Sequence, residues 1–173
     1  MSKVTGSRPQ ADAAQLIYFV GGDAAVLART EPLLKAMGST VHHAGPVGSA
    51  TAIKLSVNAL FAVQVATLAE MLALLGRNGL DAARAVEIIA STPVCSPTTR
   101  AAAAAMQAQN YAPMFPVDLA EKDLGTVLAQ AALDGVPVPM AEAVRRVFAR
   151  AVQQGYGADN ITGVARLYTP HTA

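Results

Sequence analysis

The chain has no tryptophan, one cysteine, few aromatic residues and little charge. The lone Cys95 has no second cysteine to pair with, so we expect a protein of a reducing compartment, the cytoplasm. Only 5% of the 173 residues are aromatic and the formal net charge is +1, without a basic patch, which excludes a typical nucleic-acid-binding protein. Because 53% of the residues are hydrophobic and 14% are charged, we predict large buried surfaces and a helix-rich oligomer.

Residues 50–75 form a long apolar run, yet we predict no membrane span. The run contains Lys54, Asn58, Gln64 and Glu70, and each charge at a bilayer centre costs about 2.5–3.5 kcal/mol on insertion scales. A helix buried in protein explains this run better. No cluster of Cys, His and acidic residues has ligand spacing, so we also predict no metal site.

The first 45 residues have the pattern of one α/β crossover. Residues 15–20 predict a buried strand, and Asp23 is placed to cap a helix that stops at Gly38. Pro32 predicts a kink or break in that helix near Glu31. Residues 40–44 predict a second strand. Two strands are too few for a sheet with its own core, so we interpret residues 1–45 as the end of a larger α/β domain.

From residue 46 onward the pattern is helical. The first helix, residues 50–75, is roughly 40 Å long at 1.5 Å per residue, and Gly76 and Gly79 are expected to end it. Further helices are predicted over residues 81–92, 98–110, 118–135 and 140–155, with a short last helix from residue 159. The predicted fold class is therefore mainly α: an all-helical domain over residues 46–173, preceded by a partial α/β region.

One polar pair stands inside the apolar run, directly after a glycine turn. Gly45 and Gly48 allow a tight turn or a close approach to a ligand. Lys54 and Asn58 follow, four residues apart and so on one helix face. A lysine in apolar surroundings tends to a lowered pKa, which suits proton transfer near neutral pH. The alternative is a lysine that reaches solvent and an asparagine that bonds a neighbouring loop.

Two other stretches have polar groups in suggestive positions. Lys122 and Asp123 lie near the start of a predicted helix, although a solvated helix start capped by Asp118 has the same pattern. Near the N-terminus, residues 5–7 read Thr-Gly-Ser, whose hydroxyl and N–H groups can cradle a carboxylate. A Thr-Gly-Ser sequence also occurs in ordinary loops, so neither stretch is decisive by itself.

Taken in order, the three stretches resemble the motifs of the β-hydroxyacid dehydrogenases, which include 3-hydroxyisobutyrate dehydrogenase and glyoxylate/succinic semialdehyde reductase. Residues 4–23 resemble the family's SG motif and the strand after it. Residues 45–58 resemble its G-x-x-G-x-G-x-x-x-K-x-x-x-N motif, and residues 115–123 its F-x-x-x-L-x-x-K-D motif. The resemblance implies a helical domain like the C-terminal domain of 6-phosphogluconate dehydrogenase, after a remnant of the Rossmann domain over residues 1–45.

The resemblance also implies an activity: reversible hydride transfer between NAD or NADP and a small hydroxy acid or semialdehyde. Lys54 matches the catalytic lysine, which gives or takes the proton. The residues that match substrate-binding positions are Thr5, Gly6, Ser7, Asn58 and Phe115, and those that match cofactor-side positions are Lys122 and Asp123. The implied partners are a small carboxylate substrate and a second copy of the chain, bound through the helical domain as a homodimer.

Two departures from the family pattern matter. Ala50 stands where the family motif has its third glycine, and its methyl group could change how closely the helix start approaches a ligand. The G-x-G-x-x-G pyrophosphate motif of the family is absent from these residues, so we expect the chain to be an incomplete fragment, inactive by itself. The alternatives are an inactive dimerisation module or a related enzyme. Lys54 argues against an imine reductase, which usually has aspartate or tyrosine there. A 6-phosphogluconate dehydrogenase usually has a histidine just ahead of the lysine, and residues 49–53 lack one.

Overall fold

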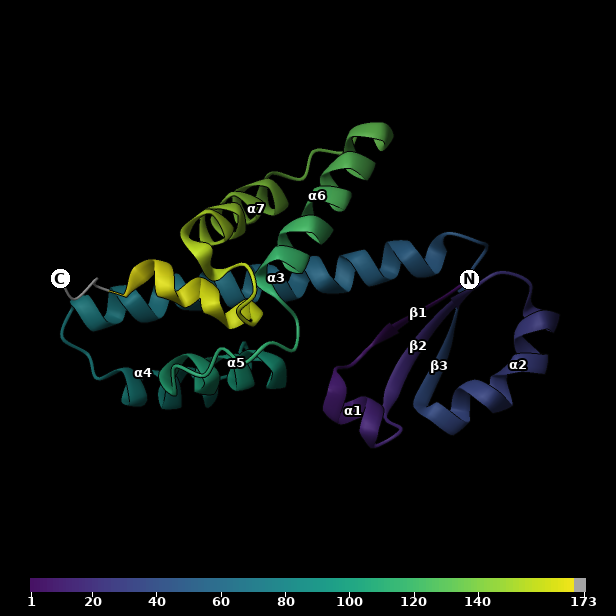
Figure 1. Cartoon of the computed structure of the whole chain (residues 1–173), viewed down its shortest axis with the longest axis horizontal. Helices are drawn as coiled ribbons and strands as arrows, with labels where there is room; N and C mark the ends of the chain where they lie inside the picture. The colour runs from purple at the N-terminus through teal and green to yellow at the C-terminus, as the bar shows by residue number, and fades with distance from the viewer. Residues whose placement is uncertain (170–173) are drawn as a thin grey trace. The chain divides into compact units, whose positions relative to one another are not determined.

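The computed structural model describes residues 1–169, so His171, one of the three histidines of the chain, lies outside the described residues. The protein is mostly helical with one small sheet (Figure 1). It divides into two compact units, Met1–Val57 and Asn58–Ala173. The long helix α3 (Ser49–Arg77) begins in the first unit and continues into the second.

The first unit contains a three-stranded sheet in the order β1-β2-β3. Strand β1 (Ser2–Thr5) pairs antiparallel with β2 (Leu16–Gly21), which pairs parallel with β3 (Gly38–Gly45). Helix α2 (Ala24–Met37) makes the predicted crossover between β2 and β3, and the short helix α1 (Arg8–Asp12) follows β1. Strand β1 and helix α1 were missed in the sequence, because each has at most five residues and no apolar period.

Helix α2 shows one correct and one wrong prediction. Asp23 caps it as predicted, accepting hydrogen bonds from the backbone N–H groups two and three residues later at 2.7 and 3.0 Å. Of the kink or break predicted near Glu31, the break is wrong, since the helix continues through Pro32 to residue 37. Proline removes only one backbone donor from the helix, and the ion pair between Glu31 and Lys35, 2.8 Å long, stabilises the same turn. The helix can therefore continue through this position.

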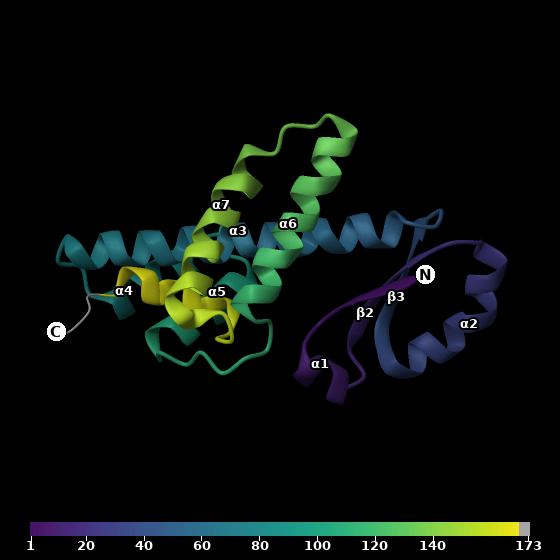
Figure 2. The same cartoon turned by 45° about the horizontal axis from the view of Figure 1, so that its top comes forward.

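The second unit is built from helices. After α3 come α4 (Ala82–Ala90), α5 (Pro97–Gln107), α6 (Val117–Asp134) and α7 (Pro139–Ala151). A single π-helical turn, η1 (Val152–Tyr156), and a 3-10 helix, η2 (Ile161–Tyr168), complete the chain that the structure describes. Helices α6 and α7 lie side by side, joined by a short link, in both Figure 1 and Figure 2.

Three predicted helix boundaries in this unit were wrong. Gly76 lies inside α3 and does not end it. Pro116, and not Asp118, is the N-cap of α6, and Asp118 lies in the first turn, where a carboxylate is favoured by the helix dipole. The helix predicted over residues 140–155 is α-helical only to Ala151, and the π turn that follows runs to Tyr156 with Gly155, whose φ is +86°, inside it.

The core of the second unit is rich in alanine, so its helices approach one another closely. Phe148 of α7 is completely buried at its centre. The other fully or nearly fully buried members come from α3, α4, α5, α6, α7 and η2: Ala62, Val65, Ala66, Leu68, Ala69, Val86, Ala102, Ala103, Met106, Val117, Ala120, Leu124, Ala141, Val144, Ala151, Ile161 and Val164.

A tyrosine near the end of η2 forms a hydrogen bond to α3. The Tyr168 hydroxyl donates a hydrogen bond of 3.1 Å to the Glu70 carboxylate. Burial of the phenol, with that hydrogen bond, raises the pKa of Tyr168 to about 12. This bond ties the last described helix to the helix that carries the central motif.

Candidate functional site

A glycine-rich turn joins β3 to α3 in the first unit. Gly45 and Gly48 have φ of +112° and +103°, conformations that favour glycine. Backbone hydrogen bonds close the turn. The Ser49 N–H donates to the Pro46 carbonyl, and two N–H groups in the first turn of α3, those of residues 51 and 52, donate to the Gly48 carbonyl. The predicted tight turn is therefore present, and it fixes where α3 starts.

Lys54 lies in the second turn of α3 and is half-buried. Ala50, which replaces the third glycine of the motif, is completely buried, so its methyl group is accommodated within the packed chain. Asn58 lies one turn beyond Lys54 on the same helix face. The spacing predicted from the sequence is thus realised on one continuous helix.

Asn58 joins the central motif to the motif of α6. Its amide nitrogen donates a hydrogen bond of 2.6 Å to a carboxylate oxygen of Asp123, and both residues are half-buried. A bond to a carboxylate is stronger than one between neutral groups. It uses one of the two amide hydrogens of Asn58 and leaves the amide's carbonyl oxygen as a separate acceptor. Two residues predicted separately from the sequence are therefore in contact within the second unit.

Phe115 stands just before the N-cap of α6, on the segment that leads into the site motif. Its ring stacks on Phe61 of α3, with centroids 6.4 Å apart and an interplanar angle of 19°. Both rings are half-buried and pack against the helical core. Phe61 is one turn beyond Asn58, so the ring pair and the Asn58–Asp123 bond join the same two segments of the fold.

Lys122 is exposed on α6, beside the half-buried Asp123. Its backbone carbonyl accepts a hydrogen bond of 3.1 Å from the Thr126 hydroxyl. An exposed cation here is available to an anionic or amide group of a ligand. The structure gives Asp123, in contrast, a partner on α3.

The Thr-Gly-Ser stretch forms the end of β1 and the start of α1. Thr5 pairs with Ile17 in the sheet, and Gly6 has a φ of +119°. Ser7 is the N-cap of α1, and its backbone N–H donates to the Gln10 side chain at 2.9 Å. Thr5 and Ser7 are both half-buried.

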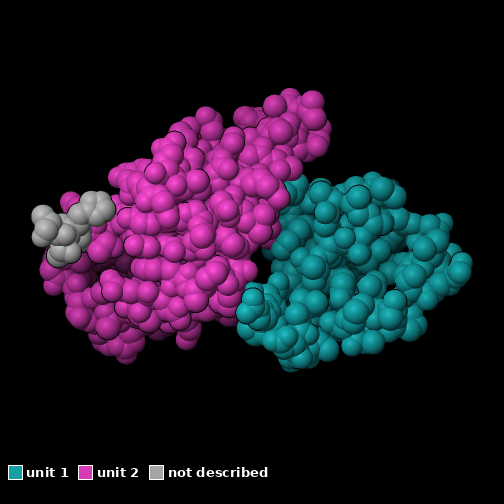
Figure 3. Space-filling view, viewed as in Figure 1, with its two compact units in different colours: residues 1–57 teal, residues 58–173 magenta. Residues whose placement is uncertain are grey.

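The predicted site residues are divided between the two units (Figure 3). Thr5, Gly6, Ser7 and Lys54 belong to the first unit. Asn58, Phe115, Lys122 and Asp123 belong to the second, where the structure brings the three segments that carry them together. Helix α3 is the one element shared by the two sets.

Sequence reasoning missed two residues of the second unit that hold this region, Phe61 and Asn160. Phe61 looks like any core residue of an apolar helix, so nothing in the pattern marked it. Asn160 is buried and accepts hydrogen bonds from the backbone N–H groups of Met114 and Phe115. The adjacent polar residues 159 and 160 were interpreted as a helix start, whereas they contact a segment some 45 positions earlier.

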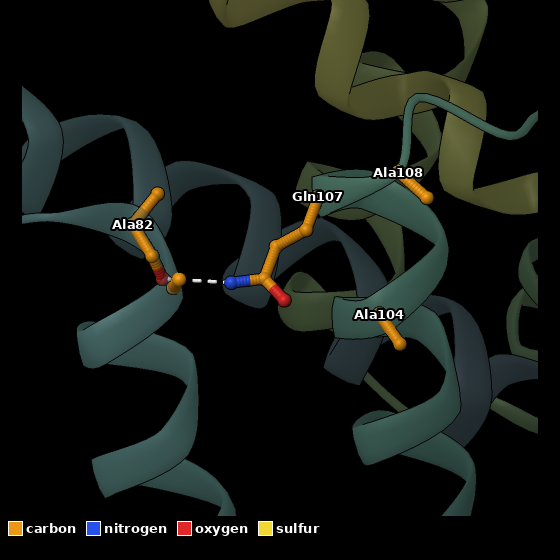
Figure 4. A pocket seen from close by; sticks show the side chains of 5 residues that line it. Ala82, Ala104, Gln107 and Ala108 are labelled. Carbon is orange, nitrogen blue, oxygen red and sulfur yellow. Dashed lines mark hydrogen bonds between the residues drawn. The ribbon is translucent and has the colours of Figure 1, made fainter.

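A shallow hollow of about 480 Å³ between α4 and α5 includes none of the predicted site residues. Ala82, Ala83, Ala104, Gln107 and Ala108 line it. Figure 4 shows the Gln107 side chain reaching towards α4, where its amide donates to the Ala82 carbonyl at 2.9 Å. The lining therefore offers no group for acid–base or nucleophilic chemistry, and we do not place the site there.

Helix α3 is long and apolar enough to cross a membrane by length and composition, and only 28% of its most apolar stretch is buried within this chain. One such helix is weak evidence for a membrane protein, because core helices pass the same test. Among residues 1–169, no three His, Cys, Asp or Glu side chains cluster so as to hold a metal ion.

Comparison with known proteins bears on both units. Residues 48–168 match the family model described as NAD-binding of NADP-dependent 3-hydroxyisobutyrate dehydrogenase. Residues 2–45 match the model of the NAD-binding domain of 6-phosphogluconate dehydrogenase. The first match alone covers well over half of the chain, and it contains Lys54, Asn58, Phe115, Lys122 and Asp123.

Individual relatives agree with these matches. The NAD-dependent L-serine dehydrogenase of Pseudomonas aeruginosa is 32% identical over 96% of this chain and 58% of its own length. The 3-hydroxyisobutyrate dehydrogenase of the same organism is 33% identical over 95% and 58%. A crystal structure of 3-hydroxyisobutyrate dehydrogenase from Salmonella typhimurium has a TM-score of 0.88 and 25% identity, over 96% of this chain and 59% of that one. The chain spans less than two thirds of the length of these relatives, and it belongs to the β-hydroxyacid dehydrogenase family.

Proposed function

We propose that this chain carries the acid–base half of an NAD(P)-dependent oxidoreductase that interconverts a small hydroxy acid with its aldehyde or keto acid. Residues 1–45 act as the last part of a Rossmann cofactor domain. Residues 46–173 act as a helical domain like the C-terminal domain of 6-phosphogluconate dehydrogenase. The ranges of the two family models support this division, and the compact units divide the chain slightly later, within α3.

The hydrogen bond between Asn58 and Asp123 is the observation that carries the proposal. It joins the K-x-x-x-N motif on α3 to the K-D motif on α6 over 2.6 Å. Asn58 and Asp123 are 65 residues apart in sequence and half-buried against each other, which differs from two separate solvated helix faces. Their contact supports the interpretation that both serve one site.

In the proposed mechanism Lys54 moves the proton. For carbonyl reduction its ammonium group donates a proton to the substrate oxygen, and for alcohol oxidation the neutral amine accepts one. Asn58, fixed by Asp123, orients the substrate oxygen beside Lys54. Thr5, Gly6 and Ser7 bind the substrate carboxylate through hydroxyl and backbone N–H groups.

The residues of this chain fit one end of a nicotinamide dinucleotide. Lys122 supplies an exposed ammonium group in the second turn of α6, and Asp123 supports that turn through Asn58. The glycine-rich pyrophosphate motif is not among these residues. When bound, NAD or NADP accepts or donates the hydride. The residues here position the substrate and handle its proton.

We further propose a cytoplasmic homodimer formed through the helical domain. One face of α3 exposes Ile53, Leu60 and Leu74, which are 39%, 63% and 53% accessible and lie at multiples of seven residues. Such a stripe on a helix predicts pairing with another helix. The same stripe favours a second candidate function, a dimerisation module without catalysis.

A cofactor titration tests the proposal. We would titrate the 173-residue chain with NADPH and with NADH, following nicotinamide fluorescence. Beside it we would titrate a chimera in which the upstream part of the P. aeruginosa 3-hydroxyisobutyrate dehydrogenase precedes residue 2. We expect binding by the chimera and none by the chain alone. A stable dimer that binds no cofactor in either form would favour the dimerisation module. Tight binding by the chain alone would refute our placement of the pyrophosphate site.

A further inference from the structure

We propose that Asn160 is a positioning residue that fixes Phe115 and the start of α6 in the site. The inference rests on the proposed function, because Phe115 and the α6 motif matter only if they serve substrate and cofactor. Asn160 lies between η1 and η2, is 7% exposed and is one of three buried polar residues in the described chain. A buried amide needs partners for its oxygen and its nitrogen.

Both ends of the Asn160 side chain are bonded. Its oxygen accepts hydrogen bonds from the backbone N–H of Phe115 at 3.1 Å and of Met114 at 3.4 Å. Its amide nitrogen donates to the Thr162 hydroxyl at 3.1 Å. Because the hydrogen bond to Thr162 restrains rotation of the amide, its oxygen stays directed at the segment that carries Phe115.

The backbone on either side of Asn160 adds to this attachment. The Asn160 N–H donates to the Tyr111 carbonyl at 2.9 Å, and the next N–H donates to the Phe115 carbonyl at 2.7 Å. In return the N–H of Val117 donates to the Asp159 carbonyl at 2.9 Å. Residues 111–117 are therefore bonded along their length to residues 159–161.

An ion pair anchors the segment that carries Asn160. The Asp159 carboxylate accepts a hydrogen bond of 2.8 Å from the Arg166 guanidinium. That guanidinium lies 4.2 Å above the centre of the Tyr156 ring and 5.9 Å from the Tyr111 ring. These contacts link the segment that carries Asn160 to the segment that it holds, because Tyr111 begins the latter.

The segment before α6 needs this support because it makes little structure of its own. Residues 111–116 form neither helix nor a regular strand, and Pro113 and Pro116 have no N–H to donate. The Asn160 oxygen is the acceptor for the partly buried Phe115 N–H, so its loss would leave that N–H without its protein partner and let the Phe115 backbone move towards water. The Phe61–Phe115 stack and the first turn of α6 would move with it.

Three variants test the proposal. Asn160→Ala removes all three side-chain hydrogen bonds. Asn160→Asp keeps acceptors for the two backbone N–H groups, and the Thr162 hydroxyl can reverse to donate to it. Asn110→Ala is the matched control, since its exposed side chain also accepts from a backbone N–H of the same segment, that of residue 112, at 3.2 Å.

The first readout is amide hydrogen exchange of residue 115, which needs no activity. We expect about tenfold or faster exchange in Asn160→Ala, and near-normal exchange in Asn160→Asp and in Asn110→Ala. Unchanged exchange in Asn160→Ala would overturn the proposal. Should that variant fail to fold, Asn160→Leu replaces it, because leucine has nearly the shape of asparagine but no acceptor for the Phe115 N–H, and exchange equal to the wild type there would also overturn the proposal.

The second readout is kinetics of the chimera with NADP⁺ and 3-hydroxyisobutyrate as probe. We expect Asn160→Ala to raise KM at least tenfold with a smaller change in kcat, and Asn160→Asp to restore KM. Faster exchange with an unchanged KM would show a structural attachment without a positioning role. If the wild-type chimera has no turnover, the proposed function fails, and the exchange of residue 115 still decides whether Asn160 holds it.

Discussion

The contact between α3 and α6 can be measured as a free energy. Replacing Asn58 or Asp123 with alanine removes a hydrogen bond of 2.6 Å that ends on a carboxylate. Hydrogen bonds to charged groups contribute about 1.5–3 kcal/mol. Both residues are half-buried, so water can reach the partner that remains, and we expect the lower end of this range. The predicted coupling energy is therefore about 1.5 kcal/mol.

A double-mutant cycle measures this coupling. The wild type, Asn58→Ala, Asp123→Ala and the double variant are unfolded in urea, and helix loss is followed by far-ultraviolet circular dichroism. The exposed pair Glu142 and Arg146, which is 2.9 Å long and spans one turn of α7, is the matched control. We expect its coupling to be about 0.3–0.5 kcal/mol.

The coupling energies of the two pairs are then compared. A coupling energy between Asn58 and Asp123 that is clearly above that of the control pair supports the interpretation that the two motifs serve one site. A coupling equal to the control or smaller would mean that the contact is incidental. The proposal that α3 and α6 serve one site would then lose the observation that carries it.

Three further predictions concern the fold. Because the folded state raises the pKa of Tyr168 from 10.0 to about 12, its stabilising effect should be complete below pH 10 and disappear as the pH rises from 10 to 12. A tyrosinate absorbance titration should show a late ionisation near pH 12 that Tyr168→Phe removes, apart from the delay due to Tyr111, whose pKa is also raised by burial. Phe148→Ala, at a completely buried site, should lower the free energy of unfolding by about 3–5 kcal/mol in urea denaturation. Gly21→Ala would place a methyl group 2.6 Å from the Pro46 carbonyl oxygen, so thermal denaturation should show a destabilised first unit, whereas Gly76→Ala should not.

Much of the secondary structure could be predicted from the sequence, because its signals are local. The Asp23 side chain caps α2 as expected, because it accepts backbone N–H hydrogen bonds from the first turn. The predicted helix of residues 50–75 is present as α3, two residues longer at its C-terminal end. Strand β1 could not be predicted, because four residues owe their strand to pairing with β2 and not to their own pattern.

The candidate site was harder to predict, because its contacts join distant segments. Spacing alone placed Lys54 and Asn58 on one face, but it could not show that Asn58 bonds to Asp123. Nor could it show that Asn160 holds the backbone of Phe115, since the signal is a single polar residue whose partner lies 45 positions earlier. The motif order and the family resemblance named the residues, and the structure supplied the contacts among those of the second unit.

The most direct test of the central claim, that Lys54 moves the proton, is the kcat of the chimera with and without that amine. We would compare the wild type with Lys54→Ala and with Lys54→Arg, which keeps the charge but is a poor proton donor at neutral pH. The account predicts that both variants lose about 10²–10⁴-fold in kcat, while NADPH still binds. Turnover within about threefold of the wild type in either variant, well short of that loss, would contradict it.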